Sequence, residues 1–133
     1  MYGFNKAEKL TNKSLIENLF VKGKSVRIFP FTIYYRIESG DSIPTSQVLI
    51  SVSKHYFKHA VKRNRIKRLT REAFRLNNHD FKEFFKESSL NYNIGFVYHT
   101  SKLCSYKTVE KSIIEALNAI KAIVGQNSDN ISE

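Results

Sequence analysis

The chain has 133 residues, a formal charge of +10 and a hydrophobic share of 41%, which fits one folded domain and excludes wholesale disorder. Its single cysteine excludes a disulfide framework and any zinc site built from several cysteines. The apolar runs are too short to span a membrane, and charged residues occupy the N-terminus where a signal peptide needs an apolar stretch. We therefore expect a small, soluble, cytoplasmic, basic protein.

The N-terminal third predicts one helix and one strand. Helical spacing of apolar residues marks 11–22, with a Ser14–Glu17 capping box and with Gly23 just after the end. Residues 26–37 alternate as a strand, but Pro30 cannot donate to a ladder, so this strand either lies at an edge or is interrupted there. The alternation places five apolar or aromatic residues on one face, which we assign to the core. They are Phe29, Phe31, Ile33, Tyr35 and Ile37.

The rest of the chain predicts a second strand over 47–53, a long helix over 58–76, a short helix from Asp80, a third strand over 93–99 and a last helix over 106–124 that ends at Gly125. Helices packed on a small sheet give an α+β fold in the order α-β-β-α-β-α. We expect a single domain over residues 1–125 and a polar, frayed tail over 126–133. The last helix has one apolar side, formed by Val109, Ile113, Leu117, Ile120 and Val124.

Most of the charge lies in one segment. Residues 54–75 hold nine Lys and Arg side chains and one acid, Glu72, whereas the other 111 residues are nearly balanced. Like charges at this density destabilise a helix, and a polyanion that neutralises them is a reason to keep them. A merely solvated surface fits less well, because such faces usually mix both signs.

A helical wheel separates the chemistry of this segment. Four apolar residues fall within an arc of about 80° that is expected to face the sheet, namely Ile66, Leu69, Ala73 and Leu76. Arginine binds phosphate in a bidentate manner, so the remaining surface favours nucleic acid as the partner. A helix lying on an acidic membrane needs a broad free apolar face, and this stripe is narrow. The cationic face and its flanks comprise Arg63, Asn64, Arg65, Lys67, Arg68, Arg71 and Arg75.

The run from Lys62 to Arg75, KRNRIKRLTREAFR, resembles the RNR signature of the bacterial ribonuclease P protein family. The resemblance covers residues 10–124. Two positions depart from the family pattern: Ile16 stands where phenylalanine is common, and Phe57-Lys58-His59 replaces a common glycine. Further matches are Val52-Ser53-Lys54, Ala60-Val61, Leu10, Phe20, Gly23, Phe31 and Tyr34.

The resemblance implies a subunit of a ribonucleoprotein endonuclease that removes the 5′ leader from precursor tRNA. The catalytic groups and Mg²⁺ would belong to the RNA subunit, with no catalytic residue and no tightly bound metal in the protein, and with neither DNA nor a membrane as a partner. It also implies a ribosomal-protein type of fold with a left-handed β-α-β crossover, against the general rule. The implied contacts are Arg63, Asn64, Arg65, Lys67, Arg68 and Arg71, joined by Arg75, for the RNA subunit, and Phe20, Phe31, Tyr34 and Lys54 for the leader cleft.

The residues themselves leave alternatives open. Alternation assigns Phe31 to the core and Tyr34 to the opposite face, whereas Phe20 fits the core and the cleft equally well. The histidines are scattered, without the spacing of zinc ligands. A non-catalytic protein of ribosomal type that binds structured RNA would share the charge and the aromatics, but the RNR run favours ribonuclease P.

Overall fold

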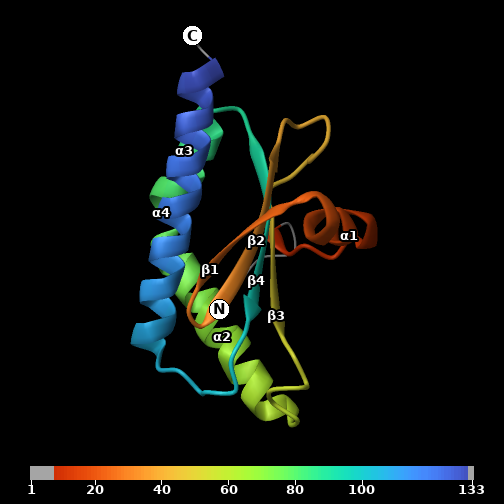
Figure 1. The fold of residues 1–133 in the computed structure, drawn as a ribbon, viewed down its shortest axis with the longest axis vertical. Coiled ribbons are helices and arrows are strands. Elements are labelled where there is room, and N and C mark those ends of the chain that lie inside the picture. Colours follow the sequence, from red (N-terminus) through yellow and green to blue (C-terminus); the bar gives the residue numbers. More distant parts are fainter. Residues whose placement is uncertain (1–7, 132–133) are drawn as a thin grey trace.

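A four-stranded sheet lies at the centre of the protein, with α2, α3 and α4 on one face and α1 on the other (Figure 1). The structure, a computed structural model, describes residues 8–131. This arrangement confirms the predicted α+β class. The elements are α1 (Lys13–Lys22), β1 (Lys24–Ile28), β2 (Phe31–Glu38), β3 (Gln47–Val52), α2 (Ala60–Asn77), α3 (His79–Glu87), β4 (Asn91–Tyr98) and α4 (Tyr106–Ile131).

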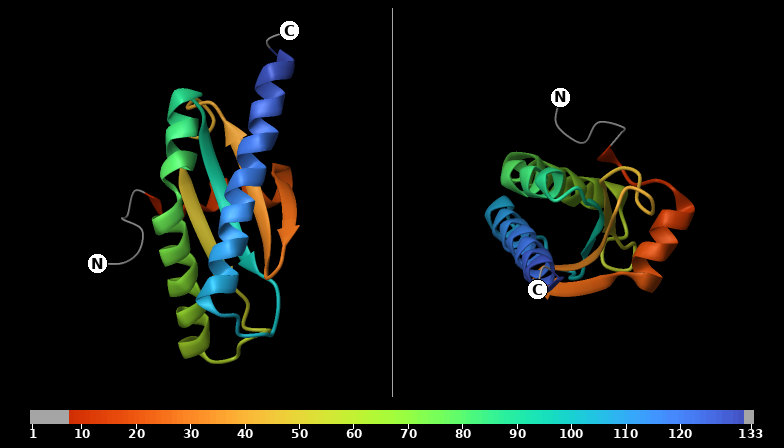
Figure 2. Two further views of the ribbon diagram at one scale, coloured as in Figure 1. Left: turned by 90° about the vertical axis from the view of Figure 1, so that its left-hand side faces the viewer. Right: turned by 90° about the horizontal axis from the view of Figure 1, so that it is seen from above.

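The sheet is mixed, with the strand order β1-β2-β4-β3. β2 pairs antiparallel with β1 and β4, whereas β3 pairs parallel with β4. The left panel of Figure 2 shows the sheet from the helix side, with β3 and β4 both running downward and β4 to the right of β3. The crossover through α2 and α3 is therefore left-handed, which is the expected exception to the general rule.

The main core lies between the sheet and the three helices on its helical face. β2 contributes alternate residues to it, since Phe31, Ile33 and Tyr35 are buried. Burying such apolar side chains stabilises a fold by roughly 25 cal/mol per Å² of surface removed from water. The apolar side predicted for α4 is confirmed, because Val109, Ile113, Leu117, Ile120 and Val124 are all buried.

α2 buries a different stripe from the one that the helical wheel predicts. Ile66 and Ala73 face the core as expected, but Leu76 is 55% exposed and Phe74 is buried instead, with its ring 5.9 Å from that of Phe96. Thr70 is also buried, and its hydroxyl donates to the Ile66 carbonyl at 2.8 Å. The larger aromatic surface gains more by burial than a leucine does, and Thr70 satisfies its polar atom within the helix.

Three apolar residues are buried outside the main core, namely Leu10, Leu19 and Ile43. Leu19 of α1 lies over Gly95 of β4, on the α1 face of the sheet. The predicted Ser14–Glu17 capping box is wrong, because Asn12 caps α1 with a side-chain oxygen that accepts from the Leu15 N–H at 3.0 Å. An asparagine cap satisfies a donor that the first turn leaves unpaired.

Residues 26–37 form two strands and a turn instead of one strand. β1 and β2 pair with each other on either side of the Phe29–Pro30 peptide, which is cis. Pro30 therefore interrupts the predicted strand, which confirms one of the two alternatives. The turn is tied to α4, because the Ser112 hydroxyl donates to the Phe29 carbonyl. Phe29 itself is 57% exposed, so its assignment to the core is wrong.

We predicted that α4 ends at Gly125, but the helix continues to Ile131. Gly125 lies in the helix, and apart from its chain neighbours and the helix's own backbone no atom lies within 4 Å of the place where a Cβ would stand. Residues 126–131, which we assigned to a tail, thus extend α4, and residues 132–133 lie outside the described part. Glycine weakens a helix but does not have to end it.

Among the glycines that the structure describes, Gly23 is where a side chain would do most damage, and Gly125 is its matched control. A Cβ at Gly23 would lie 2.2 Å from the Leu19 carbonyl oxygen and 2.9 Å from that of Tyr35. We expect Gly23→Ala to lower the free energy of unfolding by about 1–3 kcal/mol, and Gly125→Ala to raise it by about 0.5–1 kcal/mol. Urea unfolding of both variants measures this, and a Gly23→Ala protein as stable as the parent contradicts it.

Candidate nucleic-acid interface

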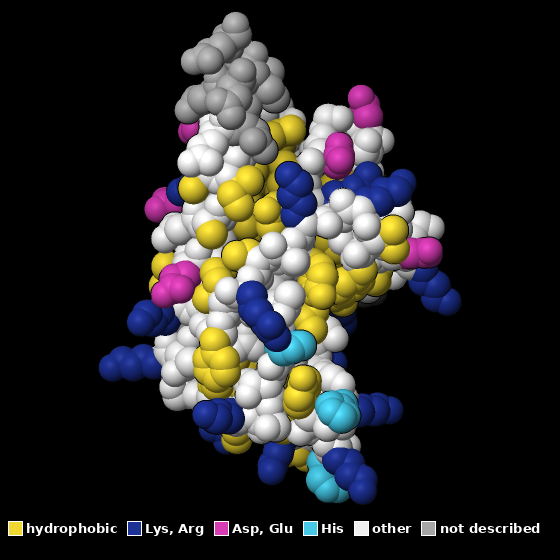
Figure 3. Space-filling view, in the orientation of Figure 1, with side chains coloured by type: hydrophobic (Ala, Val, Ile, Leu, Met, Phe, Trp, Pro, Cys, Tyr) yellow, Lys and Arg dark blue, Asp and Glu magenta, His cyan; other side chains and the backbone are white. Residues whose placement is uncertain are grey.

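α2 turns a cationic face to solvent while its other side is buried in the core. Asn64, Arg65 and Arg68 are exposed, whereas Lys67 and Arg71 are half-buried on one flank. Figure 3 shows Lys and Arg side chains around the lower part of the molecule, where Figure 1 places the N-terminal half of α2, and the acidic side chains of this view lie above them. The buried stripe thus fixes the direction in which the cations point.

Two of the seven predicted RNA contacts already have partners within the protein. The Arg63 guanidinium donates to the carbonyls of Phe57 and Lys58 at 2.7 and 2.9 Å. Arg75 forms an ion pair with Glu72, with 2.6 Å between Nη2 and Oε1. Among the described residues, Arg65, Lys67, Arg68 and Arg71 form no ion pair. These four cations, beside Asn64, remain free for an external anion.

The electrostatics of α2 work against the helix itself. Lys67 and Arg71 lie four residues apart, as do Arg71 and Arg75, and such like-charged pairs each cost about 0.2–0.5 kcal/mol. The first turn holds no acid, and His59 at the N-cap makes no side-chain capping hydrogen bond. An anion placed along this helix would relieve the repulsion.

The predicted leader cleft is assembled in part on the α1 face. The rings of Phe20 and Tyr34 lie 4.7 Å apart at an interplanar angle of 64°, and Phe20 is 39% exposed. Gly95 of β4 lies beneath them, and a Cβ there would approach Leu19 to 3.2 Å. The missing side chain allows α1 to pack closely on the sheet and to hold the two rings together.

Phe31 does not belong to this surface. It is 1% exposed on the opposite face, where its ring packs against Phe96 and Tyr98 at 6.0 and 5.5 Å. Its place in the leader cleft, which the resemblance implies, is therefore wrong, and the assignment from strand alternation is confirmed. Side chains of successive strand residues point to opposite faces, so Phe31 and Tyr34 cannot share one.

Lys54 is exposed in the turn that follows β3. Leu49 of β3 pairs with Gly95, and Lys54 follows five residues later, about 16 Å or less along the sheet. The same turn holds Tyr56, whose ring lies 5.9 Å from that of His99, and sequence reasoning missed both residues. No spacing in the sequence indicates that contact, because it joins the ends of two different strands.

The loop that follows β4 is held by a buried tyrosine. The Tyr98 hydroxyl donates to the Lys102 carbonyl at 2.6 Å and accepts from the Cys104 N–H at 3.0 Å. Burial raises the pKa of Tyr98 far above its ordinary value, so the hydroxyl remains a donor even in alkaline solution. In residues 8–131, no group of three or more His, Cys, Asp or Glu side chains is placed to hold a metal ion.

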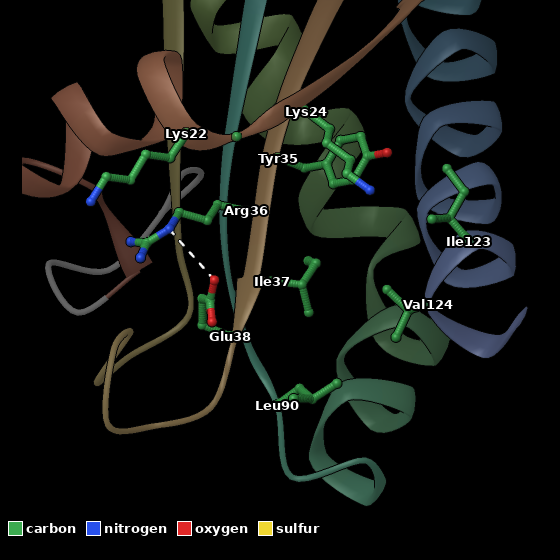
Figure 4. A pocket seen from close by; sticks show the side chains of 10 residues that line it. Lys22, Lys24, Tyr35, Arg36, Ile37, Glu38, Leu90, Ile123 and Val124 are labelled. Carbon is green, nitrogen blue, oxygen red and sulfur yellow. Dashed lines mark ion pairs between the residues drawn. The ribbon is translucent and has the colours of Figure 1, made fainter. Parts of the chain in front are cut away.

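A hollow of about 280 Å³ lies away from these surfaces, where the end of β2 meets α1 and the C-terminal half of α4. Figure 4 shows Lys22 and Arg36 on one side of it and Ile37, Ile123 and Val124 on the other. Arg36 pairs with Glu38 across 3.8 Å. None of the predicted site residues lines this hollow.

Comparisons with known proteins agree with the geometry. The family model described as "Ribonuclease P" matches residues 4–121. The chain belongs to the ribonuclease P protein family. The ribonuclease P protein component of Porphyromonas gingivalis is 36% identical over 116 residues, which cover 87% of this chain and 85% of the relative. That of Clostridioides difficile is 36% identical over 111 residues, covering 83% and 89%.

Solved structures of the ribonuclease P protein family share the fold. The RNase P protein of Staphylococcus aureus superimposes with a TM-score of 0.68 at 26% identity, covering 87% of this chain and 97% of that one. The protein from Thermotoga maritima, at 24% identity and a TM-score of 0.63, shows the likeness of fold alone over 83% and 94% of the two chains. No described helix is both long and apolar enough to cross a membrane.

Arg63 and Arg68 should differ in what they do for the free protein. Arg63→Ala removes two charged hydrogen bonds that tie the start of α2 to the preceding turn, and we expect it to lower the free energy of unfolding by about 1–2 kcal/mol. Arg68→Ala removes an exposed cation and should change it by less than about 0.5 kcal/mol. Thermal melts of the two variants measure the difference, and equal stabilities would show that the Arg63 contacts contribute nothing.

Proposed function

We propose that this chain works as the protein subunit of ribonuclease P, with the RNA subunit as its partner. The free cationic face of α2, present in a member of this family, is the observation that carries the proposal. The ribonucleoprotein would cleave precursor tRNA at the 5′ leader in the cytoplasm, with the reacting groups supplied by the RNA. The protein contributes binding surfaces.

The α2 face supplies the contact with the RNA subunit. Arg65, Arg68 and Arg71 can each offer a planar fork of donors to phosphate oxygens, and Lys67 adds a point charge. Lys67 and Arg71 are half-buried, so their side chains lose less freedom on binding than fully exposed ones do. Arg63 acts differently: it holds the turn before α2 through Phe57 and Lys58.

The α1 face supplies the contact with the leader. Proteins bind single-stranded RNA by stacking bases on aromatic rings beside a basic groove, at about 1–3 kcal/mol per base. Phe20 and Tyr34 form such a pair of rings at the surface, and Lys54 supplies a cation in the turn after β3. Mature tRNA has no leader, so these contacts would favour substrate over product.

Mg²⁺ acts, on this proposal, on the RNA side of the complex. This ion prefers oxygen ligands and keeps several of its waters, and phosphate groups of folded RNA supply such oxygens. The cations of α2 neutralise part of the same backbone charge, so we expect the protein to reduce the Mg²⁺ concentration that the RNA subunit needs.

Reconstitution tests the proposed function. The full chain is mixed with a bacterial ribonuclease P RNA at low Mg²⁺, and cleavage of a leader-bearing precursor tRNA is compared with that by the RNA alone. We expect the protein to increase both cleavage and substrate affinity. Binding to the RNA without any gain in cleavage or affinity would instead identify a structural RNA-binding protein of ribosomal type.

The two surfaces should separate in binding measurements. Tyr34→Ala is expected to weaken precursor tRNA binding to the assembled enzyme by about fivefold or more while leaving mature tRNA unchanged, because one base stack is lost. Arg68→Ala is expected to weaken assembly with the RNA subunit by about three- to tenfold at moderate salt.

Tyr34→Phe is the matched control, since it keeps the ring and should keep precursor affinity. Equal losses of precursor and mature tRNA binding in Tyr34→Ala would contradict the leader assignment. Unchanged assembly of Arg68→Ala would contradict the role of the α2 face.

A further inference from the structure

We infer that His55, Tyr56 and His99 form a second base-stacking site for single-stranded RNA, beyond the Phe20–Tyr34 pair. The inference rests on the proposed function, in which the leader of precursor tRNA supplies the strand. These three residues, here called the imidazole–tyrosine row, come from the turn after β3 and from the end of β4.

The rings of the row are adjacent and accessible. The Tyr56 centroid lies 5.2 Å from that of His55 and 5.9 Å from that of His99, with interplanar angles of 72° and 61°. His55 and His99 are exposed and Tyr56 is half-buried. Because the rings meet edge to face, each contact covers at most one face of one ring, and the row keeps ring faces open to solvent. Imidazole and phenol rings are both surfaces on which RNA bases stack.

The row continues the surface that begins at Phe20 and Tyr34. Gly95 lies beneath that pair, and His99 follows it by four residues, so strand alternation returns to the same face about 13 Å farther on. The His99 N–H donates to the Pro30 carbonyl at 2.7 Å, which keeps the chain extended beyond the end of β4. Val97, which lies between them, is half-buried.

Hydrogen bonds hold the row in place before any RNA binds. The N–H groups of Tyr56 and Phe57 both donate to the Ser53 carbonyl at 3.2 Å, and the His55 N–H donates to the Ser53 hydroxyl at 3.0 Å. Phe57 is buried against Tyr98, and Arg63 donates to its carbonyl. Arg63 is thus a positioning residue for the row, and a preformed site loses little entropy on binding.

The charge around the row suits a polyanion. Lys54 and Lys58, which flank His55 and Tyr56 in the sequence, are exposed, and no acidic residue occurs between Glu38 and Glu72 apart from Asp41. His55 and Tyr56 also lie shortly before α2, which begins at Ala60. A strand that leaves the Phe20–Tyr34 pair along β4 would therefore reach cations in addition to rings.

The test uses the assembled enzyme and precursor tRNAs whose leaders increase in length from none. Tyr56→Leu combined with His99→Ala removes the aromatic surface but keeps the bulk that Tyr56 packs against the core. We expect this double variant to lose at least about fivefold in affinity for long-leader precursors and nothing for leaderless tRNA. The loss should begin at a longer leader than the loss caused by Tyr34→Ala.

The controls separate the possible failures. Tyr56→Phe should keep full affinity, and His79→Ala, an exposed histidine at the start of α3, should have no effect. Melting temperatures show whether each variant is folded. Suppose that the affinity of the wild type depends on leader length. If the double variant then binds as the wild type does, or loses the same affinity at every leader length, this inference alone is overturned. A wild type without leader dependence overturns the leader contact in the proposed function and the inference with it.

Discussion

The burial of one side of α2 is the constraint on which the rest of the structure depends. Ile66, Ala73 and Phe74 hold the helix against the sheet and α4, while its exposed cations repel each other. A lone helix of this composition would be weak, because helices of this length owe most of their stability to packing. The core thus keeps a concentrated positive charge in one fixed orientation, and a partner gains the electrostatic relief.

β4 connects this core to the other functional face. Phe96 and Tyr98 pack into the main core on the α2 side, whereas Gly95 lies on the α1 face and His99 follows the end of the strand. Because successive residues of a strand point to opposite faces, this single strand lies beneath both RNA surfaces. A shift of one residue in the register of β4 would remove both, which couples binding to the correct pairing with β2 and β3.

Much of this could be predicted from local patterns, and the failures have physical causes. The apolar side of α4 and the alternation of Phe31 follow directly from helix and strand periods. The choice of Phe74 over Leu76 depends on how α2 meets Phe96, which a wheel does not contain. Arg63 appears as one more cation in the sequence, but its hydrogen bonds depend on the turn before α2. Tyr56 and His99 meet only because β3 and β4 are neighbours.

Arg63 and Arg75 already form bonds within the protein, and this affects how strongly salt should weaken the complex with RNA. The steepness with which salt weakens an RNA complex follows from the number of counterions released, about 0.7–0.9 per neutralised phosphate. The charge of Arg75 is already paired with Glu72 and displaces no counterion until that pair breaks, and Arg63 must give up two carbonyl hydrogen bonds before those donors can turn to a phosphate. Complex formation should therefore be less sensitive to salt than the nine cations of residues 54–75 suggest, so the assembled particle tolerates a wider range of ionic conditions than a flexible tail of equal charge.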